Sequence, residues 1–319
     1  MTTLDDFYHV GIRVPNLDAA MAELTAAMGV TWAPPMEREN AAWMPGVGHV
    51  QLQVRYTYSC EGPVHLELVQ GEVGSIWNGD DRRGLHHLGV WTDDVAGMTE
   101  TLIAAGGTLE IAGDSPENGY GRFTYVRTPQ GILIEPVSRE VQPRFEAWWA
   151  AGEPATGEFA FDQFFHVGIR VDDLQAAMDE MTALFGVGWA SVQDRLMPMW
   201  IPGPGNVTPR LALTYSAEGP VRLELMQGEA DSPWATDGWP GPHHFGVWTD
   251  DVAGTSQRLL DNGWTLELAG MAPNDGYGRL TYVRSPQGVL LEPMSDVSRD
   301  RFAAWWAGGD LTPAAKLAV

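Results

Sequence analysis

Four short segments of the chain combine a histidine with a glycine two residues later inside an alternating apolar run. They read HVGI from His9, HLGV from His87, HVGI from His166 and HFGV from His244. Each is followed along the chain by an apolar run with one glutamate, namely Glu67, Glu135, Glu224 and Glu292. A carboxylate inside such a strand is costly unless it is paired, protonated or bound to a cation. Two imidazoles and two carboxylates in each half of the chain therefore favour a divalent ion of the first transition row.

A structural role is the alternative for each of these residues taken singly. A single histidine on a strand is usually a core residue whose ring is satisfied by a neighbour, and a single buried glutamate is usually ion-paired. Here both residue types recur at matched places in modules whose remaining sequences differ. That recurrence within one half favours metal binding over packing.

Strand alternation divides the paired histidines His86 and His87. HVGI aligns with HLGV, so we take His87 as the counterpart of His9. Successive side chains of a strand point to opposite faces, so His86 is expected to face away from the ligand set and to be structural. The second pair is divided in the same way, with His244 as the ligand and His243 as the structural residue.

The chain is a duplication. The two copies are offset by a constant 157 residues, as between FYHVGIRV at 7–14 and FFHVGIRV at 164–171. We predict two domains, residues 1–150 and 158–310, joined by a small, polar linker at 150–158. Each domain holds two modules, at about 5–72 and 84–138 in the first domain and about 162–229 and 241–295 in the second.

Each module is expected to run strand, helix and then about three strands. In the first module FYHVGIRV alternates like a half-buried strand, and a helix follows from a cap at Asn16 to Gly29. Strand-like runs then occupy 49–58 and 63–70. The second module repeats this order, with strands at 85–91, 108–111, 121–127 and 131–138 and a helix at 94–105 capped by Asp93. The order predicts an α+β architecture of curved, antiparallel-rich sheets with the helices outside.

The composition limits the partners. The 319 residues carry a formal net charge of −23, which repels phosphate backbones and anionic lipids, so neither nucleic acid nor a membrane surface is an expected partner. The single cysteine, Cys60, excludes an intrachain disulfide and fits a reducing compartment. No apolar run approaches the roughly 20 residues of a membrane span, and the first residues lack a signal-peptide pattern. We expect a cytoplasmic protein with a small-molecule substrate.

These segments resemble the vicinal oxygen chelate superfamily, which includes glyoxalase I, methylmalonyl-CoA epimerase, extradiol dioxygenases and bleomycin-resistance proteins. The resemblance covers nearly the whole chain and rests on HVGI with LELV and HLGV with IEPV, and on their copies in the second half. It implies four βαβββ modules that pair into two cup-shaped domains. It also implies one divalent ion per domain, whether Zn, Ni, Co, Mn or Fe(II), bound by His9, Glu67, His87, Glu135, His166, Glu224, His244 and Glu292.

The ligand count resembles that of the glyoxalase and epimerase branch, because both halves keep the fourth carboxylate position. That branch implies an isomerase or lyase that chelates vicinal oxygens of a small, hydrophobic carbonyl substrate and moves a proton through an enediolate, with Glu135 and Glu292 as bases. Two alternatives stay open. One is an Fe(II) ring-cleaving dioxygenase, in which typically only one half binds iron, through two histidines and one glutamate. The other is a non-catalytic protein that binds a drug or toxin.

Eight further residues are expected to contact the substrate: Arg13, Arg170, His65, Arg222, Tyr58, Tyr215, Trp43 and Trp200. Arg13 stands four residues after His9, where glyoxalases carry an arginine that contacts the carboxylate of glutathione. His65 shares a strand face with Glu67, and Trp43 precedes a Pro/Gly-rich segment suited to a loop over a hydrophobic ligand. The tryptophans of the tails RFEAWW and RFAAWW are expected to anchor domain packing instead. A homodimer is left open, because the modules could pair within a half or across chains.

Overall fold

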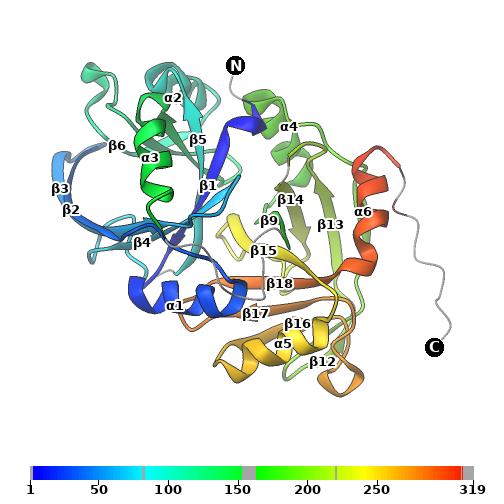
Figure 1. Ribbon diagram of the computed structural model, residues 1–319. Helices are drawn as coiled ribbons and strands as arrows, with labels where there is room; N and C mark the ends of the chain where they lie inside the picture. The colour runs from blue at the N-terminus through cyan, green and yellow to red at the C-terminus, as the bar shows by residue number, and fades with distance from the viewer. Residues whose placement is uncertain (1–2, 81–82, 153–162, 220, 310, 312–319) are drawn as a thin grey trace.

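The computed structural model describes residues 3–80, 83–152, 163–219, 221–309 and 311, and it consists of two halves of similar topology (Figure 1). Each half is a curled sheet with few helices, as the sequence predicts for two cup-shaped α+β units. Residues 153–158 of the predicted linker lie outside the described residues. Within the described part of the chain, no helix has both the length and the apolar character needed to span a membrane.

The first half is a closed barrel with the strand order β1-β4-β3-β2-β6-β7-β8-β5. Strands β1 and β5 are antiparallel neighbours, so the two modules of this half pair with each other. On the far side the barrel closes where Trp43 of β2 pairs with Ala112 of β6. The elements are β1 Phe7–Arg13, α1 Leu17–Met28, β2 Met36–Met44, β3 Gly48–Tyr58, β4 His65–Gly71, β5 Gly84–Thr92, α2 Val95–Ala104, β6 Thr108–Ala112, β7 Thr124–Arg127, β8 Leu133–Ser138 and α3 Gln142–Trp149.

The second half is a ten-stranded sheet with the order β10-β13-β14-β9-β15-β18-β17-β16-β11-β12. The counterpart of β2 is broken between Leu196 and Met199, where Pro198 has no N–H to donate to a strand ladder. The pieces separate, because β10 pairs with β13 whereas β11 pairs with β12 and β16. The elements are β9 Phe164–Arg170, α4 Leu174–Phe185, β10 Gln193–Leu196, β11 Met199–Ile201, β12 Gly205–Val207, β13 Arg210–Tyr215, β14 Arg222–Gly228, β15 Gly241–Thr249, α5 Val252–Asp261, β16 Thr265–Ala269, β17 Thr281–Arg284, β18 Leu290–Ser295 and α6 Arg299–Trp306.

The long helices begin and end as their sequences predict, with one correction. The Asn16 side chain accepts from the backbone N–H of Ala19 (3.0 Å), and Gly29 closes α1 in the left-handed conformation. Helix α2, in contrast, is capped by Asp94, whose carboxylate accepts from Gly97 N (2.8 Å), and not by Asp93. The predicted helix was one residue too long at its start, because adjacent aspartates carry the same capping signal.

The loop expected around Trp43 is a β-hairpin. Strand β2 pairs along its whole length with β3, from Met36 opposite Tyr56 to Met44 opposite Gly48. The Pro/Gly-rich segment that follows Trp43 supplies only the tight turn between the two strands. In the second half Trp200 likewise lies on a strand, β11.

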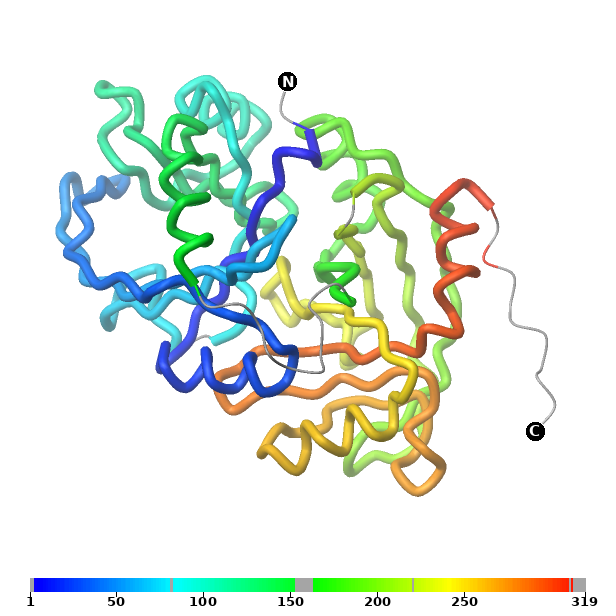
Figure 2. Tube along the Cα trace, viewed as in Figure 1, coloured from blue at the N-terminus to red at the C-terminus, as the bar shows by residue number. Residues whose placement is uncertain are grey.

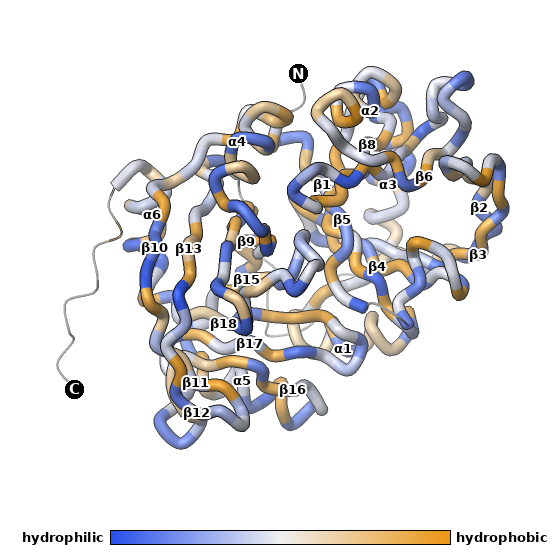
Figure 3. The backbone as a smooth tube through the Cα atoms, turned by 180° about the vertical axis from the view of Figure 1, so that it is seen from behind, coloured by the Kyte–Doolittle hydropathy of each residue, from blue (hydrophilic) through white to orange (hydrophobic). Residues whose placement is uncertain are grey.

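The two halves pack on each other with an approximate internal symmetry, visible where α1 lies beside β17 (Figure 2). Glu23 of α1 accepts a hydrogen bond from the backbone N–H of Gln287 (3.2 Å). The matched contact joins Glu180 of α4 to the backbone N–H of Gln130 (3.2 Å). One buried apolar cluster includes residues of both halves. Hydrophobic segments follow strands of both halves, such as β4 and β18 (Figure 3). The duplicated halves therefore form one core.

Candidate metal centres and substrate cavity

The His-x-Gly pattern follows from the pairing of β1 with β5. His9 stands opposite Gly89 and His87 opposite Gly11, so each imidazole lies over the glycine of the other strand. A Cβ atom on Gly11 would lie 1.7 Å from the ring of His87, and one on Gly89 would lie 1.8 Å from the ring of His9. Glycine is required at both positions because any side chain there would occupy the space of a histidine ring.

The glutamates extend the same two cross-strand rows. In one row Glu67 of β4 is the partner of Gly11, which is the partner of His87. In the other row Glu135 of β8 is the partner of Gly89, which is the partner of His9. Each glycine thus separates a glutamate from a histidine and leaves room for their side chains to converge. The second half repeats both rows with Glu224, Gly168 and His244, and with Glu292, Gly246 and His166.

Two β-bulges change which side chains reach the interior. The pairing of β1 with β5 skips Tyr8 and His86, so each is the extra residue directly before a ligand histidine. Strict alternation of side chains along each strand would turn both residues away from the interior. Instead Tyr8 lines the interior cavity, and Nδ1 of His86 lies 3.1 Å from Nδ1 of His87. The prediction that His86 faces away from the ligand set is therefore wrong.

The second pair shows the same correction. Nδ1 of His243 lies 3.2 Å from Nδ1 of His244, across an equivalent bulge. In both halves Nε2 of the second histidine faces the ligand set, so its Nδ1 can donate a hydrogen bond to the preceding histidine. Such a bond holds a ligand imidazole in one orientation and one tautomer.

The four side chains of the first half converge on one point. Nε2 of His9 lies 2.9 Å from Nε2 of His87 and 3.0 Å from Oε2 of Glu135. Nε2 of His87 lies 3.0 Å from Oε2 of Glu67 and 3.2 Å from Oε2 of Glu135. Both histidines are completely buried. The separations resemble the edges, about 3.3 Å long, of a tetrahedron of ligands with bonds of roughly 2.0–2.1 Å to a central ion.

The second half forms a matching set. Nε2 of His166 lies 3.0 Å from Nε2 of His244, 3.3 Å from Oε2 of Glu224 and 3.2 Å from Oε2 of Glu292. Nε2 of His244 lies 3.4 Å from each of the same two oxygens. In both halves the four ligand atoms lie within 4.8 Å of one another, and all eight residues are buried.

A divalent cation fits both sets. Apart from the histidines of its own set, no described residue donates a hydrogen bond to the oxygens that face each centre, Oε2 of Glu67, Glu135, Glu224 and Glu292. Buried carboxylate oxygens are costly unless a cation neutralises them. Two imidazole nitrogens with two carboxylate oxygens form a donor set that suits zinc and its first-row neighbours. Each half could therefore hold one ion.

The charges within the sets are strongly coupled. Burial opposes ionisation of Glu67, but hydrogen bonds from His87 and His9 outweigh it and hold its pKa below the ordinary value. Burial would lower the pKa of His87, yet hydrogen bonds to Glu135 and Glu67 raise it to about 9. In the second half Glu224 and Glu292 likewise raise the pKa of His166 to about 9. A metal ion must therefore displace a proton from each centre.

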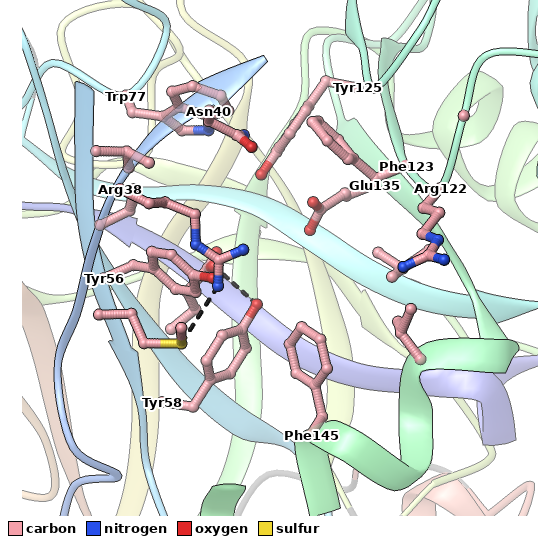
Figure 4. A pocket seen from close by; sticks show the side chains of 18 of the residues that line it. Arg38, Asn40, Tyr56, Tyr58, Trp77, Arg122, Phe123, Tyr125, Glu135 and Phe145 are labelled. Carbon is pink, nitrogen blue, oxygen red and sulfur yellow. Dashed lines mark hydrogen bonds between the residues drawn. The ribbon is translucent and has the colours of Figure 1, made fainter. Parts of the chain in front are cut away.

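A cavity of about 650 Å³ opens beside the first set, inside the barrel, and we call it the first cup (Figure 4). Glu67 and Glu135 line it. Tyr58 lines it too, and its hydroxyl donates to Oε1 of Glu67 (2.7 Å), which fixes that carboxylate. Much of the remaining wall is aromatic: Tyr8, Tyr56, Trp77, Phe123, Tyr125, Phe145 and Trp148.

Of the predicted substrate contacts in the first half, only Tyr58 lines the first cup. Arg13 instead directs Nη1 towards the carbonyl of Ile76 (3.4 Å). His65 stacks on Trp149 (ring centroids 3.7 Å apart) and donates from Nδ1 to the carbonyl of Ser59 (2.7 Å). Trp43 lies at the barrel seam. These three side chains hold the wall together and do not face the cavity.

Their counterparts in the second half have similar surroundings. Arg170 donates from Nη1 to the carbonyl of Ala235 (2.7 Å). Arg222 donates to the carbonyl of Ser216 (2.7 Å), and its guanidinium lies over the ring of Trp306 (4.3 Å). Trp200 pairs with Ala269 at the edge of the sheet. Tyr215 is completely enclosed, with an exposed fraction of 1%.

The sequence analysis missed several residues of the first cup. Phe145 and Trp148 of α3 line the cavity, although the tryptophans of this tail were expected only to anchor packing. Trp149, in contrast, belongs to a buried cluster and has the expected packing role. Three arginines also line the cup: Arg38, Arg122 and Arg144. A signal for them was present, because the repeat places arginines at all three matched positions, 195, 279 and 301.

Bulkier side chains narrow the corresponding space of the second half at two positions of its wall. Val69 and Val137 of the first cup are replaced by Met226 and Met294, and Tyr56 by Leu213. All three belong to one buried cluster. The cluster also contains Phe302 and Trp305 of α6, and Trp305 is 0% exposed whereas its counterpart Trp148 is partly exposed. We call this region the second cup.

Comparison with known proteins supports the fold. A family model described as the glyoxalase/bleomycin resistance protein/dioxygenase superfamily matches residues 8–125 and 165–282. The chain is similar in structure to a mutant of 4-hydroxymandelate synthase from Streptomyces coelicolor, with 15% identity, 91% of this chain and 92% of that chain covered, and a TM-score of 0.55. A search of curated proteins found no match.

Two further structures are similar at lower TM-scores. One is a catechol 2,3-dioxygenase, with 16% identity, coverage of 92% of this chain and 89% of that chain, and a TM-score of 0.49. The other is the Mn(II)-bound glyoxalase from Novosphingobium aromaticivorans, with 14% identity, coverage of 93% and 83%, and a TM-score of 0.49. The similarity to the synthase, at 15% identity, shows the fold alone and leaves the reaction open.

Proposed function

Since the chain belongs to the glyoxalase/bleomycin resistance protein/dioxygenase superfamily, we propose that it is a divalent-metal-dependent isomerase or lyase whose active site is the first cup. One observation carries the proposal. A buried set of two histidines and two glutamates lies beside a cavity large enough for a small molecule, and both carboxylates line that cavity. The substrate class we propose is a small carbonyl compound with oxygens on neighbouring carbons.

A bound divalent ion would stabilise negative charge on the substrate oxygens. The residues of the chain then supply position and proton transfer. Glu135 lines the cavity and would remove the proton from the carbon next to the carbonyl. As that C–H bond breaks, its electron pair moves toward the carbonyl oxygen and an enediolate forms. Return of the proton to the neighbouring carbon, with transfer of the hydroxyl proton to the former carbonyl oxygen, completes an isomerisation.

The other residues hold this arrangement in place. The bond from Tyr58 fixes Glu67, so Glu135 is the better candidate for the mobile base. His86 orients His87 from behind. The aromatic walls exclude water from the reacting carbon, which protects the enediolate.

The test is solvent deuterium exchange into α-hydroxyketones such as 2-hydroxyacetophenone, followed by NMR. Metal-loaded protein should catalyse exchange, chelated protein should not, and Glu135→Gln should lose about 10²–10⁴-fold in rate while still folding. Metal analysis is expected to find two ions per chain. Exchange that continues unchanged in Glu135→Gln or in chelated protein would contradict the proposal.

A second candidate is an Fe(II) ring-cleaving dioxygenase, favoured by the aromatic lining of the first cup. It predicts oxygen consumption with a catechol that depends on Fe(II) and is absent with Zn(II). The complete four-residue ligand set in each half favours the isomerase or lyase. A binding protein without turnover would retain its ligand after chelation, which the same metal titration would detect.

A further inference from the structure

The rim of the first cup is positively charged although the chain as a whole is strongly acidic. Arg38 comes from β2, Arg122 from the turn before β7 and Arg144 from α3, and all three line the cavity. Figure 4 shows Arg38 and Arg122 on opposite sides of the cavity, with Glu135 between them. In a chain with a formal net charge of −23, three cations in one cavity wall are a local concentration of positive charge, beside the acidic lining residues Glu67, Glu135 and Asp114.

These guanidinium groups are not neutralised by the protein. Among the described residues, none of the three forms an ion pair with a carboxylate, and the neighbours of Arg38 are the uncharged Met36 Sδ (3.2 Å) and Tyr56, whose ring lies 5.0 Å away. Asp114 also lines the cavity, but its Oδ1 accepts from Ser115 N (2.7 Å) and from Asn118 (3.1 Å). The arginines therefore remain available to an anion from solution.

The same three positions carry arginines in the second half. Arg195, Arg279 and Arg301 lie near one another: burial lowers the pKa of Arg301 first, and the charges of Arg195 and Arg279 lower it further. Nε of Arg195 and Nε of Arg301 are buried without an acceptor among the described residues. Other lining positions differ between the halves, since Asn40 corresponds to Met197. The repeated feature is thus a trio of arginines that lie near one another in the second half and line the cavity in the first.

We infer that Arg38, Arg122 and Arg144 form an anion-binding rim, and that the substrate of the first cup is a small aromatic acid. Its carboxylate binds the guanidinium groups, which match carboxylate geometry with paired N–H donors. Its ring packs among the aromatic walls, and its vicinal oxygens face Glu67 and Glu135. This inference deepens the proposed function and rests on it for the placement of the active site.

The test compares 2-naphthoate with 2-naphthamide, two ligands of the same shape that differ in charge, by isothermal titration calorimetry. Both metal-loaded and chelated protein are titrated, so that coordination of the carboxylate by the ion is separated from binding at the rim. We expect naphthoate to bind about tenfold or more tightly than naphthamide in both forms. Higher salt should reduce the difference, because the arginines are exposed.

The decisive variant is Arg38→Gln/Arg122→Gln/Arg144→Gln, which should bind the two ligands equally. The thermal unfolding midpoint of the triple variant checks that it folds. The single variant Arg122→Gln is a milder change for the case in which the triple variant does not fold. The matched control is Arg279→Gln, which should keep the preference because Arg279 does not line the first cup. Equal binding of the two ligands to the wild type, or a preference that survives in the triple variant, overturns the inference. Failure to bind metal would instead count against the proposed function, while the preference in chelated protein would still decide the inference.

Discussion

The two cups have the same ligand set and a different interior. Both place two histidines and two glutamates within 4.8 Å, and both need glycine opposite each histidine. The wall of the cavity differs: Met226 and Met294 occupy space that Val69 and Val137 leave open in the first cup. Ligand convergence depends on strand pairing, which both copies keep, whereas cavity volume depends on individual side chains. After duplication, one copy can therefore keep the ligand set while the volume of its cavity changes.

The largest expected difference between the two cups concerns Glu135 of β8 and Glu292 of β18. Glu135→Gln should lower proton exchange by about 10²–10⁴-fold, because it removes the base from the open cup. Glu292→Gln should leave exchange within about a factor of three, since Met226 and Met294 narrow its cup. Initial rates by NMR check both variants. Equal losses of exchange rate in the two variants would show that the cups work together, and would contradict the difference proposed between them.

The next effect concerns the glycines. Gly11→Ala and Gly168→Ala each place a Cβ less than 2 Å from a ligand imidazole. Each variant should therefore displace one histidine and bind one ion per chain in place of two. Weakened metal binding of about 10–100-fold is the expected scale. Only Gly11→Ala should lose exchange. Elemental analysis measures the ions, and two ions retained in either variant would contradict the close packing described here.

Exchanging the filling residues tests the volume argument directly. Val69→Met/Val137→Met should raise KM about tenfold or more while the chain still binds two ions, because substrate is excluded but the ligands are untouched. The reverse change, Met226→Val/Met294→Val, should cost about 1–3 kcal/mol of unfolding free energy through the cavities it leaves. Denaturant titration measures that cost. An unchanged KM in the first variant would place the substrate elsewhere.

The smallest expected effect concerns Glu180 of α4, which contacts Gln130 of the other half. Burial raises the pKa of Glu180, so its ionised form is disfavoured in the folded state. The stability linked to this group is present below the unfolded-state pKa and is lost as pH rises through the higher folded-state pKa. Glu180→Gln should therefore stabilise the protein slightly at pH 7, by roughly 0.5 kcal/mol or less, with little effect at pH 4. Unfolding curves at the two pH values measure the change in stability. A gain in stability at pH 4 alone would contradict the predicted direction.

Much of the fold could be predicted because its signals are local. The helix from Asn16 to Gly29 and the alternating strands around His9 and His87 depend on neighbours in the sequence. The failures have a common cause. A Pro/Gly-rich segment cannot distinguish the turn of a hairpin after Trp43 from a long loop, and period-2 alternation cannot reveal the bulge that turns His86 inward. Both depend on the partner strand.

The sequence by itself determined the duplication, the order of elements and the eight residues of the two ligand sets. Those residues could be identified because a histidine or glutamate in an apolar strand has few inexpensive roles. Only the tertiary structure decided that one cup is open, and that Arg38, Arg122 and Arg144 meet at its rim. A cavity is what remains after side chains from many distant segments have packed, and no local pattern encodes that remainder.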